Sequence, residues 1–177
     1  MNLYISGSNR KNNSYEVLKD LMNENDKLIS LEDLSINFCM GCGACSDKLP
    51  EHCVIEDDME VIYKSMIASD KIIIMSPIYM NHITGILKNM IDRLNPFYSH
   101  GLLKGKKLYI LTVGQVDEEE NEDIAEDIKK YFEGISEFFH FDVTYLRNFS
   151  SGKTDNVKEN YDNYDEIIKE LREKIEE

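Results

Sequence analysis

The sequence has no tryptophan, only three prolines, and no cysteine outside residues 39–53. It contains no apolar run long enough to span a membrane, and its first residues do not resemble a secretory signal peptide. We therefore expect a cytoplasmic protein without membrane contacts. In that reducing compartment, clustered cysteines serve metal binding or redox chemistry more often than structural disulfides.

Positive charge is also scarce. The chain has 20 Lys and Arg against 34 Asp and Glu, which gives a net charge of −14 at pH 7. This balance argues against binding to nucleic acid or to anionic membrane surfaces. The acidic runs in residues 117–127 and after Asn156 are typical of solvated helix faces, and they would also suit a basic electron-transfer partner.

Hydrophobic periodicity predicts an α/β fold in one domain covering residues 1–177. Short apolar runs alternate with segments of helical spacing, as in a parallel sheet covered by helices on both faces. Pro77 is expected to end the third strand. The cysteines lie in a loop insertion at about residues 36–57. The predicted strands are residues 2–6, 27–31, 71–76, 107–113 and 141–146, and the predicted helices are residues 14–22, 59–67, 82–94, 118–139 and 164–175.

The loop after the first predicted strand has the composition of a phosphate receptor. Hydroxyls, an amide and a guanidinium precede a helix N-terminus, whose free N–H groups attract anions. The loop lacks the three glycines of a dinucleotide fingerprint and the Gly-Lys-Ser/Thr of a P-loop. An ordinary polar turn with a helix cap explains it equally well. The candidate residues are Ser6, Ser8, Arg10, Asn13 and Ser14.

Two further loops follow predicted strands at the same edge of the sheet, where ligands of such folds bind. The first of these loops offers a flat apolar surface and main-chain groups to a planar heterocycle. It consists of Pro77, Ile78, Tyr79, Met80 and Asn81. The second runs from Thr112 through Gly114 to Gln115 and closes the site from the other side. Three ligand-ready loops at the expected strand ends are a stronger signal than any one alone.

These motifs resemble those of a known family. The run Gly7-Ser8-x-Arg10 resembles the phosphate loop of the NADPH-dependent FMN reductase branch of the flavodoxin-like superfamily. The second signature of that branch resembles residues 76–79 and 85–94. The cysteines before Asp57-Asp58-Met59 resemble its iron–sulfur flavoprotein subgroup. The resemblance covers residues 1 to about 115, and Thr112-Val113-Gly114-Gln115 departs from a more glycine-rich run.

The resemblance implies a flavodoxin-like three-layer sandwich with a five-stranded parallel sheet of order 2-1-3-4-5. It also implies FMN, with its phosphate on Ser8, Arg10, Asn13 and Ser14 and its ring against residues 77–81 and 112–115. NAD(P)H would be the co-substrate, and the chain would form a homodimer or homotetramer with subunit contacts near the flavin. The chemistry would belong to FMN, so no catalytic side chain is assigned.

Cys39, Cys42, Cys45 and Cys53 are the candidate metal ligands. Four thiolates suit either a [4Fe–4S] cluster or a tetrahedral zinc ion, and a disulfide switch or thiols that bind nothing would also fit the sequence. The packed triplet is unlike the two separated Cys-x-x-Cys pairs common in structural zinc sites. The subgroup's own pattern, which allows a longer final gap, favours the cluster.

The leading functional hypothesis is an FMN-dependent oxidoreductase. It would pass electrons between NAD(P)H or a ferredoxin-type donor and a small acceptor such as a flavin or a quinone. Two competing hypotheses are a flavodoxin-like electron carrier without its own small substrate, and a metal- or thiol-based redox sensor that binds no flavin.

Overall fold

The sheet forms the centre of the structure, a computed structural model that describes residues 1–47, 53–116, 119 and 121–177. Its main path runs β2-β1-β3-β5-β6, and all neighbours along this path are parallel. A short β4 pairs with β3 in the antiparallel direction. The strands are β1 (Leu3–Ser6), β2 (Lys27–Ser30), β3 (Lys71–Tyr79), β4 (His82–Ile83), β5 (Lys107–Gly114) and β6 (Asp142–Ser150). The predicted α/β class and the order 2-1-3-4-5 are confirmed, with β5 and β6 as the fourth and fifth predicted strands.

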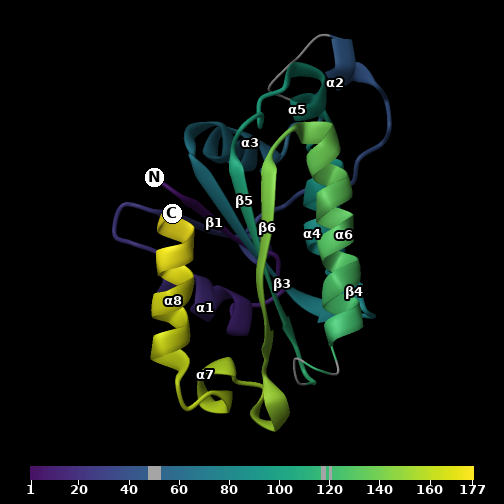
Figure 1. Ribbon diagram of the computed structural model, residues 1–177. Coiled ribbons are helices and arrows are strands. Elements are labelled where there is room, and N and C mark those ends of the chain that lie inside the picture. Colours follow the sequence, from purple (N-terminus) through teal and green to yellow (C-terminus); the bar gives the residue numbers. More distant parts are fainter. Residues whose placement is uncertain (48–52, 117–118, 120) are drawn as a thin grey trace.

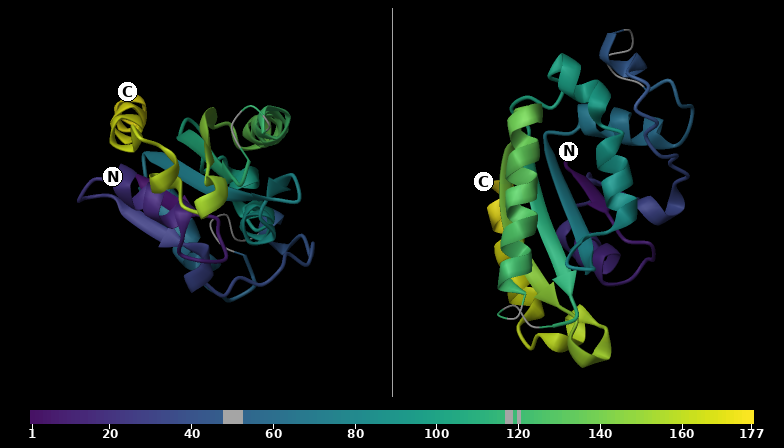
Figure 2. Two further views of the ribbon diagram at one scale, coloured as in Figure 1. Left: turned by 90° about the horizontal axis from the view of Figure 1, so that it is seen from below. Right: turned by 90° about the vertical axis from the view of Figure 1, so that its right-hand side faces the viewer.

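Helices cover both faces of this sheet (Figures 1 and 2). One face carries α3 (Met59–Ala68), α4 (Gly85–Asp92), α5 (Asn95–His100) and α6 (Glu122–Phe139). The other face carries α1 (Asn13–Leu21), α7 (Val157–Asn160) and α8 (Tyr164–Glu176). Two short elements, η1 (Leu31–Asp33) and α2 (Ala44–Asp47), lie in the connection between β2 and α3, and η2 (Gly152–Thr154) follows β6.

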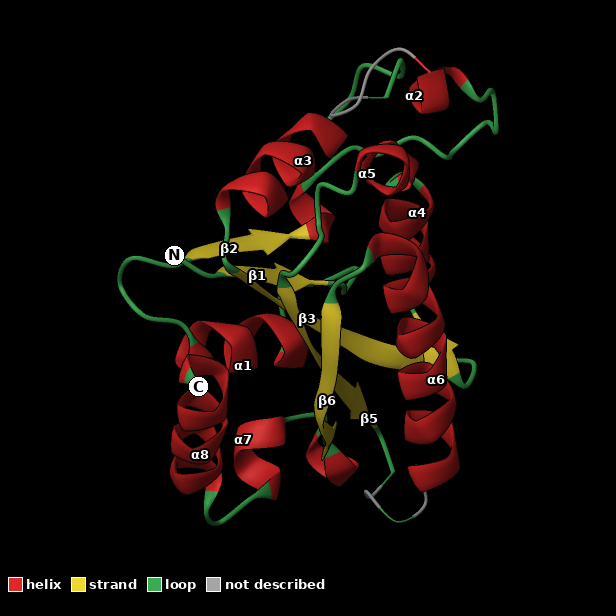
Figure 3. Ribbon diagram, turned by 45° about the horizontal axis from the view of Figure 1, so that its top comes forward, coloured by secondary structure: helices red, strands yellow, loops and turns green. Residues whose placement is uncertain are grey.

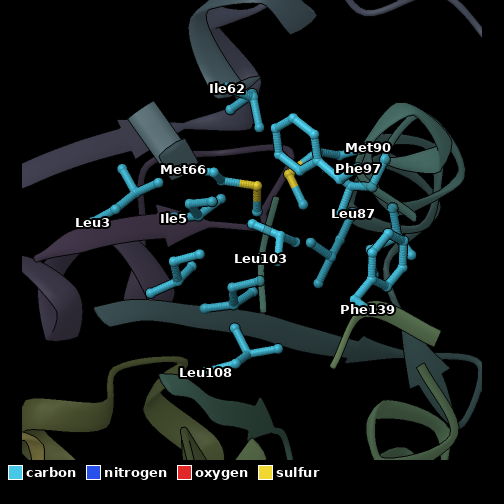
Figure 4. Packing of buried hydrophobic residues seen from close by; sticks show 14 of the residues in the cluster. Leu3, Ile5, Ile62, Met66, Leu87, Met90, Phe97, Leu103, Leu108 and Phe139 are labelled. Carbon is cyan, nitrogen blue, oxygen red and sulfur yellow. The ribbon is translucent and has the colours of Figure 1, made fainter. Parts of the chain in front are cut away.

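The alternation of side chains along β3 explains the two cores. Ile72 and Ile74 point to the α3–α4–α6 face, whereas Ile73 and Met75 point to the α1–α8 face. A strand covered on both faces must be apolar at every position, which is why β3 reads as a continuous hydrophobic run. Figure 4 shows part of the first core, where residues of β1, α3, α4, α5 and β5 meet.

Pro77 does not end the third strand, contrary to the sequence-based expectation. β3 continues to Tyr79, and Pro77 pairs in register with Val113 of β5. On the β1 side of β3, the Met75 carbonyl accepts a hydrogen bond from Gly7 N. Backbone groups two residues apart in a strand point to the same side, so the backbone nitrogen of Pro77 also faces β1. Because the register of β1 with β3 ends at Met75, the missing N–H of Pro77 interrupts no ladder there.

The predicted helix over residues 82–94 is also wrong at its start. Met80 and Asn81 have φ of 47° and 63° and form a two-residue turn between β3 and β4. The helix begins only after Thr84, whose Oγ1 accepts a hydrogen bond from Leu87 N at 3.2 Å. The chain turns again at Arg93, and a separate helix, α5, follows.

The fifth predicted strand extends further than its alternating pattern, to Ser150. The pairing of β6 with β5 shifts between Ile110 and Leu111, which leaves Leu146 without a partner in the register. Such a bulge reverses the sidedness of the residues that follow and hides the rest of the strand from a period-two pattern. In α6, residues 118 and 120 of the predicted helix lie outside the described residues. No helix in the described part of the chain is long and apolar enough to cross a membrane.

Candidate functional site

The loop between β1 and α1 is held against the start of α4. Gly7 N donates to Met75 O at 2.8 Å, and Thr84 Oγ1 donates to Gly7 O at 2.5 Å. A Cβ on Gly7 would lie 3.0 Å from Leu87 Cδ2, so close packing of backbone against side chain explains the glycine. These contacts aim the following polar residues at the carboxyl-terminal edge of the sheet.

Ser14, at the second position of α1, supplies a buried hydroxyl to this edge. The residue is 2% exposed, and its Oγ has no hydrogen-bond partner among the described residues. Buried hydroxyls are normally paired, because an unpaired one costs roughly 1 to 3 kcal/mol. The first N–H groups of a helix are likewise free to bind an anion. The N-terminus of α1 therefore has the donors that a phosphate monoester needs.

Arg10 and Asn13 join this loop to a distant segment. Arg10 Nη2 lies 3.0 Å from Asp155 Oδ2, and both side chains are about half exposed. Asn13 Nδ2 donates to Asp155 O at 3.1 Å, and Val157 N donates to Asn13 Oδ1 at 3.0 Å. The segment after β6 thus borders the phosphate loop, and its carboxylate neutralises the guanidinium of that loop.

A pocket of about 310 Å³ lies at this edge. That volume falls in the range of small-molecule sites. Three stretches line it: the β1–α1 loop, the end of β3 and the end of β5, joined by the segment after β6. Its lining residues are Ser8, Arg10, Asn12, Asn13, Ser14, Pro77, Ile78, Tyr79, Val113, Gly114, Gln115, Ser151 and Asp155.

Twelve residues were singled out for the cofactor, and eight of them line this pocket whereas four do not. The twelve are Ser6, Ser8, Arg10, Asn13, Ser14, Pro77, Ile78, Tyr79, Met80, Asn81, Thr112 and Gly114. Ser6 is fully buried below it. Thr112 is also fully buried, and its Oγ1 bonds to Tyr145 Oη and, at 2.8 Å, to Asn148 Oδ1. Met80 and Asn81 form the exposed turn beyond the pocket, where Met80 is 98% exposed.

Outside the three predicted loops, sequence reasoning missed Ser151 and Asp155, which also line the pocket. Their signal was present, because both follow the carboxyl end of a strand in the same parallel sheet. The strand was expected to end at residue 146, so its true end and the loop behind it were not predicted to border the site.

The four cysteines border a second pocket of about 270 Å³, together with Asp92 and Asn95. Cys39 and Cys42 are exposed, Cys45 and Cys53 are half-buried, and Asn95 Nδ2 lies 3.0 Å from Cys45 Sγ. Four thiols around one hollow have the chemistry of an iron–sulfur or zinc site. Within the described residues, however, no three potential ligands stand close enough to hold a metal ion.

The two pockets lie at opposite ends of α4. Thr84, before the first turn of this helix, contacts the phosphate loop, whereas Asp92 at its last turn borders the cysteines. In Figures 1 and 3, α2 lies at one end of the molecule and α7 at the other. Within a single chain, the cysteine loop therefore does not lie beside the pocket at the strand ends. The connection after β2 turns back along α4 before it reaches the first cysteine.

A parallel sheet in this order, with its pocket at the strand ends and helices on both faces, defines a flavodoxin-like fold. A family model described as NADPH-dependent FMN reductase matches residues 2–121, and the chain belongs to that family. An iron–sulfur flavoprotein of Methanocaldococcus jannaschii is 30% identical over 135 residues, which cover 72% of this chain and 69% of the relative.

A second relative and a solved structure extend the comparison. An iron–sulfur flavoprotein of Archaeoglobus fulgidus is 36% identical over 91 residues, which span 50% of this chain but only 40% of that protein. A solved structure of a flavone reductase superimposes with a TM-score of 0.68 over 99% of this chain and 63% of that chain, at 17% identity. This last similarity supports the fold alone.

Proposed function

We propose that the chain is an FMN-dependent oxidoreductase that transfers electrons from NAD(P)H or a ferredoxin-type donor to a small acceptor such as a flavin or a quinone. The observation that carries this proposal is the buried, unpaired Ser14 hydroxyl beside the N-terminus of α1, inside a pocket at the carboxyl edge of the sheet. Family membership and this donor set support the same cofactor.

Two groups of residues divide the work of holding FMN. Ser8, Arg10, Asn13 and Ser14 would bind the phosphate through hydroxyl, guanidinium and amide donors, and residues 77–79 with Gly114 would form the surface against the ring. FMN, when bound, supplies both one-electron and two-electron chemistry. The protein's contribution would be to orient the ring and to leave one of its faces open to a substrate.

Flavin titration tests this assignment. We expect the flavin-free protein to bind FMN much more tightly than riboflavin, because riboflavin lacks the phosphate. Arg10→Gln should narrow that difference in affinity, whereas Arg172→Gln, on α8 at the opposite end of α1, should leave it unchanged. Absence of flavin binding, or equal affinity for the two flavins, would contradict the proposal.

We further propose that the four cysteines hold a metal centre, with a [4Fe–4S] cluster favoured over zinc. The common pocket of the thiols and the names of two related flavoproteins support this assignment. Iron, sulfide and zinc analysis with a visible spectrum, on protein purified without oxygen, tests it. Protein that carries neither metal after reconstitution would contradict it.

We propose a homodimer or homotetramer as the working form. The separation of the two pockets within one chain supports this, since a second copy can bring its cysteines to the exposed Tyr79–Met80 tip beside the first pocket. Light scattering of the flavin-loaded protein tests the assembly, and NAD(P)H oxidation with and without ferredoxin separates an enzyme from a one-electron carrier. A monomer at assay concentrations would contradict the assembly.

A further inference from the structure

A buried ion pair lies at the base of the cysteine segment, which we define as residues 38–54. Arg93 follows the last turn of α4, and Asp57 precedes α3. Their side chains are 0% and 4% exposed, and Nη1 of Arg93 lies 2.7 Å from Asp57 Oδ2. Nη2 of the same guanidinium lies 3.2 Å from the other carboxylate oxygen, so the pair is bidentate.

The same guanidinium also reaches the main chain on both sides of the segment. Nη1 donates to the Asn37 carbonyl at 2.7 Å, and Nη2 donates to the Ile55 carbonyl at 3.3 Å. Asn37 is two residues before Cys39, and Ile55 is two residues after Cys53. One side chain therefore contacts both ends of a segment that carries every cysteine of the protein.

Three further hydrogen bonds repeat this arrangement. The Asn37 N–H donates to Asp57 Oδ2 at 2.9 Å, and the Ser35 N–H donates to Asp58 Oδ2 at 2.7 Å. From α4, Asn89 Nδ2 donates to the Ile36 carbonyl at 2.8 Å. Each of these hydrogen bonds joins one end of the segment to the other end or to the helix.

Stability alone is a poor explanation for such a pair. Removing two charges from water costs several kcal/mol for each ion, and a buried pair often stabilises a protein no better than apolar residues of the same volume. A charged pair with backbone contacts does, however, define a single geometry, which apolar contacts do not. Lysine cannot replace arginine in this role, because its single ammonium does not match the fork of two terminal nitrogens.

We propose that Arg93 is a positioning residue for the cysteines: its guanidinium, paired with Asp57, holds the two ends of the segment together and so keeps Cys39 and Cys53 within reach of one metal centre. The inference rests on the proposed function of the cysteines as ligands of a metal centre. Cys42 and Cys45 lie on the chain between Cys39 and Cys53. Their approach to the same metal centre depends on the two ends of the segment being held together by Arg93.

A disulfide measurement tests the positioning role of Arg93 without any metal. In a full-length chain carrying Cys42→Ser and Cys45→Ser, only Cys39 and Cys53 remain, and equilibration with glutathione buffers gives their effective concentration. We expect Arg93→Lys to lower it about tenfold or more, since a flexible connection reaches only the millimolar range.

Arg172→Lys is the matched control. Arg172 also donates to two main-chain carbonyls, those of Asp20 and Leu21, but it joins α8 to α1 on the other face of the sheet. We expect this variant to leave the Cys39–Cys53 equilibrium unchanged. An equal fall in both variants, no fall in Arg93→Lys, or a parent chain that forms no disulfide would overturn the proposal.

A double variant and a cobalt(II) titration complete the experiment. If Arg93→Lys does not fold, the double variant Arg93→Met with Asp57→Leu removes both charges at once and is better tolerated than half a buried pair. It should show the same fall. Cobalt(II) titration of the four-cysteine chain, followed by its thiolate absorption, reports separately on metal binding. Failure of cobalt binding would count against the metal centre, whereas the disulfide equilibrium still decides the role of Arg93.

Discussion

Ser14→Ala should weaken FMN binding without destabilising the flavin-free protein. In the flavin-free protein the Ser14 hydroxyl is buried at 2% exposure without a partner among the described residues. Its removal relieves a desolvation cost of roughly 1 to 3 kcal/mol, from which the loss of packing must be subtracted. We expect the free energy of unfolding to stay constant or rise by about 1 kcal/mol. That rise corresponds to roughly 2 to 4 °C in melting temperature for a chain of this size.

The effect on FMN has the other sign. A hydrogen bond to a charged group contributes about 1.5 to 3 kcal/mol, so loss of the hydroxyl should weaken FMN binding roughly ten- to hundredfold. Riboflavin affinity should change little, because the hydroxyl is assigned to the phosphate. Fluorescence titration with both flavins and urea unfolding of the flavin-free protein measure the two quantities.

Ser30→Ala is the control for this prediction. The Ser30 hydroxyl is also buried, at 3% exposure, and also unpaired among the described residues, but it does not line the pocket. Its removal should affect stability in a similar way and leave FMN affinity unchanged. If the two variants weaken FMN equally, or if Ser14→Ala destabilises the flavin-free protein by more than about 1 kcal/mol, the hydroxyl is structural and the phosphate assignment is wrong.

Three further perturbations follow from the same contacts. Asparagine tolerates the φ of 53° at position 155, so Asp155→Asn should free the Arg10 guanidinium without straining the backbone. We expect FMN affinity to rise about fivefold and riboflavin affinity to stay unchanged. Weaker FMN binding in a flavin titration would contradict this prediction. Burial by itself raises the pKa of Asp57, but hydrogen bonds from a buried guanidinium and two backbone N–H groups hold that pKa below its usual 3.8. The ionised Asp57 carboxylate therefore stabilises the fold above about pH 4, and this stability is lost as the pH falls through the folded-state pKa. Asp57→Asn should flatten the acid side of a profile of melting temperature against pH. An unchanged profile would count against the ion pair. Gly114→Ala places a Cβ 2.3 Å from Asn121 Nδ2 and should cost roughly 1 to 3 kcal/mol of stability as well as FMN affinity, whereas a wild-type urea midpoint would show that the side chain moves freely.

Much of the fold followed from local patterns. The continuous apolar runs of β3 and β5 identified buried parallel strands, and the strand-end rule then placed Ser8, Ser14 and Pro77 near one another from the sequence alone. The structure differs from these predictions where tertiary packing overrides a local sequence preference. Pro77 is tolerated in β3 because its neighbour β1 has ended, and that is a property of the sheet rather than of the sequence around the proline.

The sequence by itself determined the fold class, the three loops of the pocket and the grouping of the cysteines, because strand periodicity and loop chemistry are local properties. Only the tertiary structure decided which distant groups meet. Asp155 faces Arg10 across 145 residues, and Arg93 joins Asn37 to Asp57 at the base of the cysteine segment. The tertiary structure also placed the cysteines at the far end of α4 from the pocket. No periodicity encodes these contacts, since each depends on how helices and connections pack around a completed sheet.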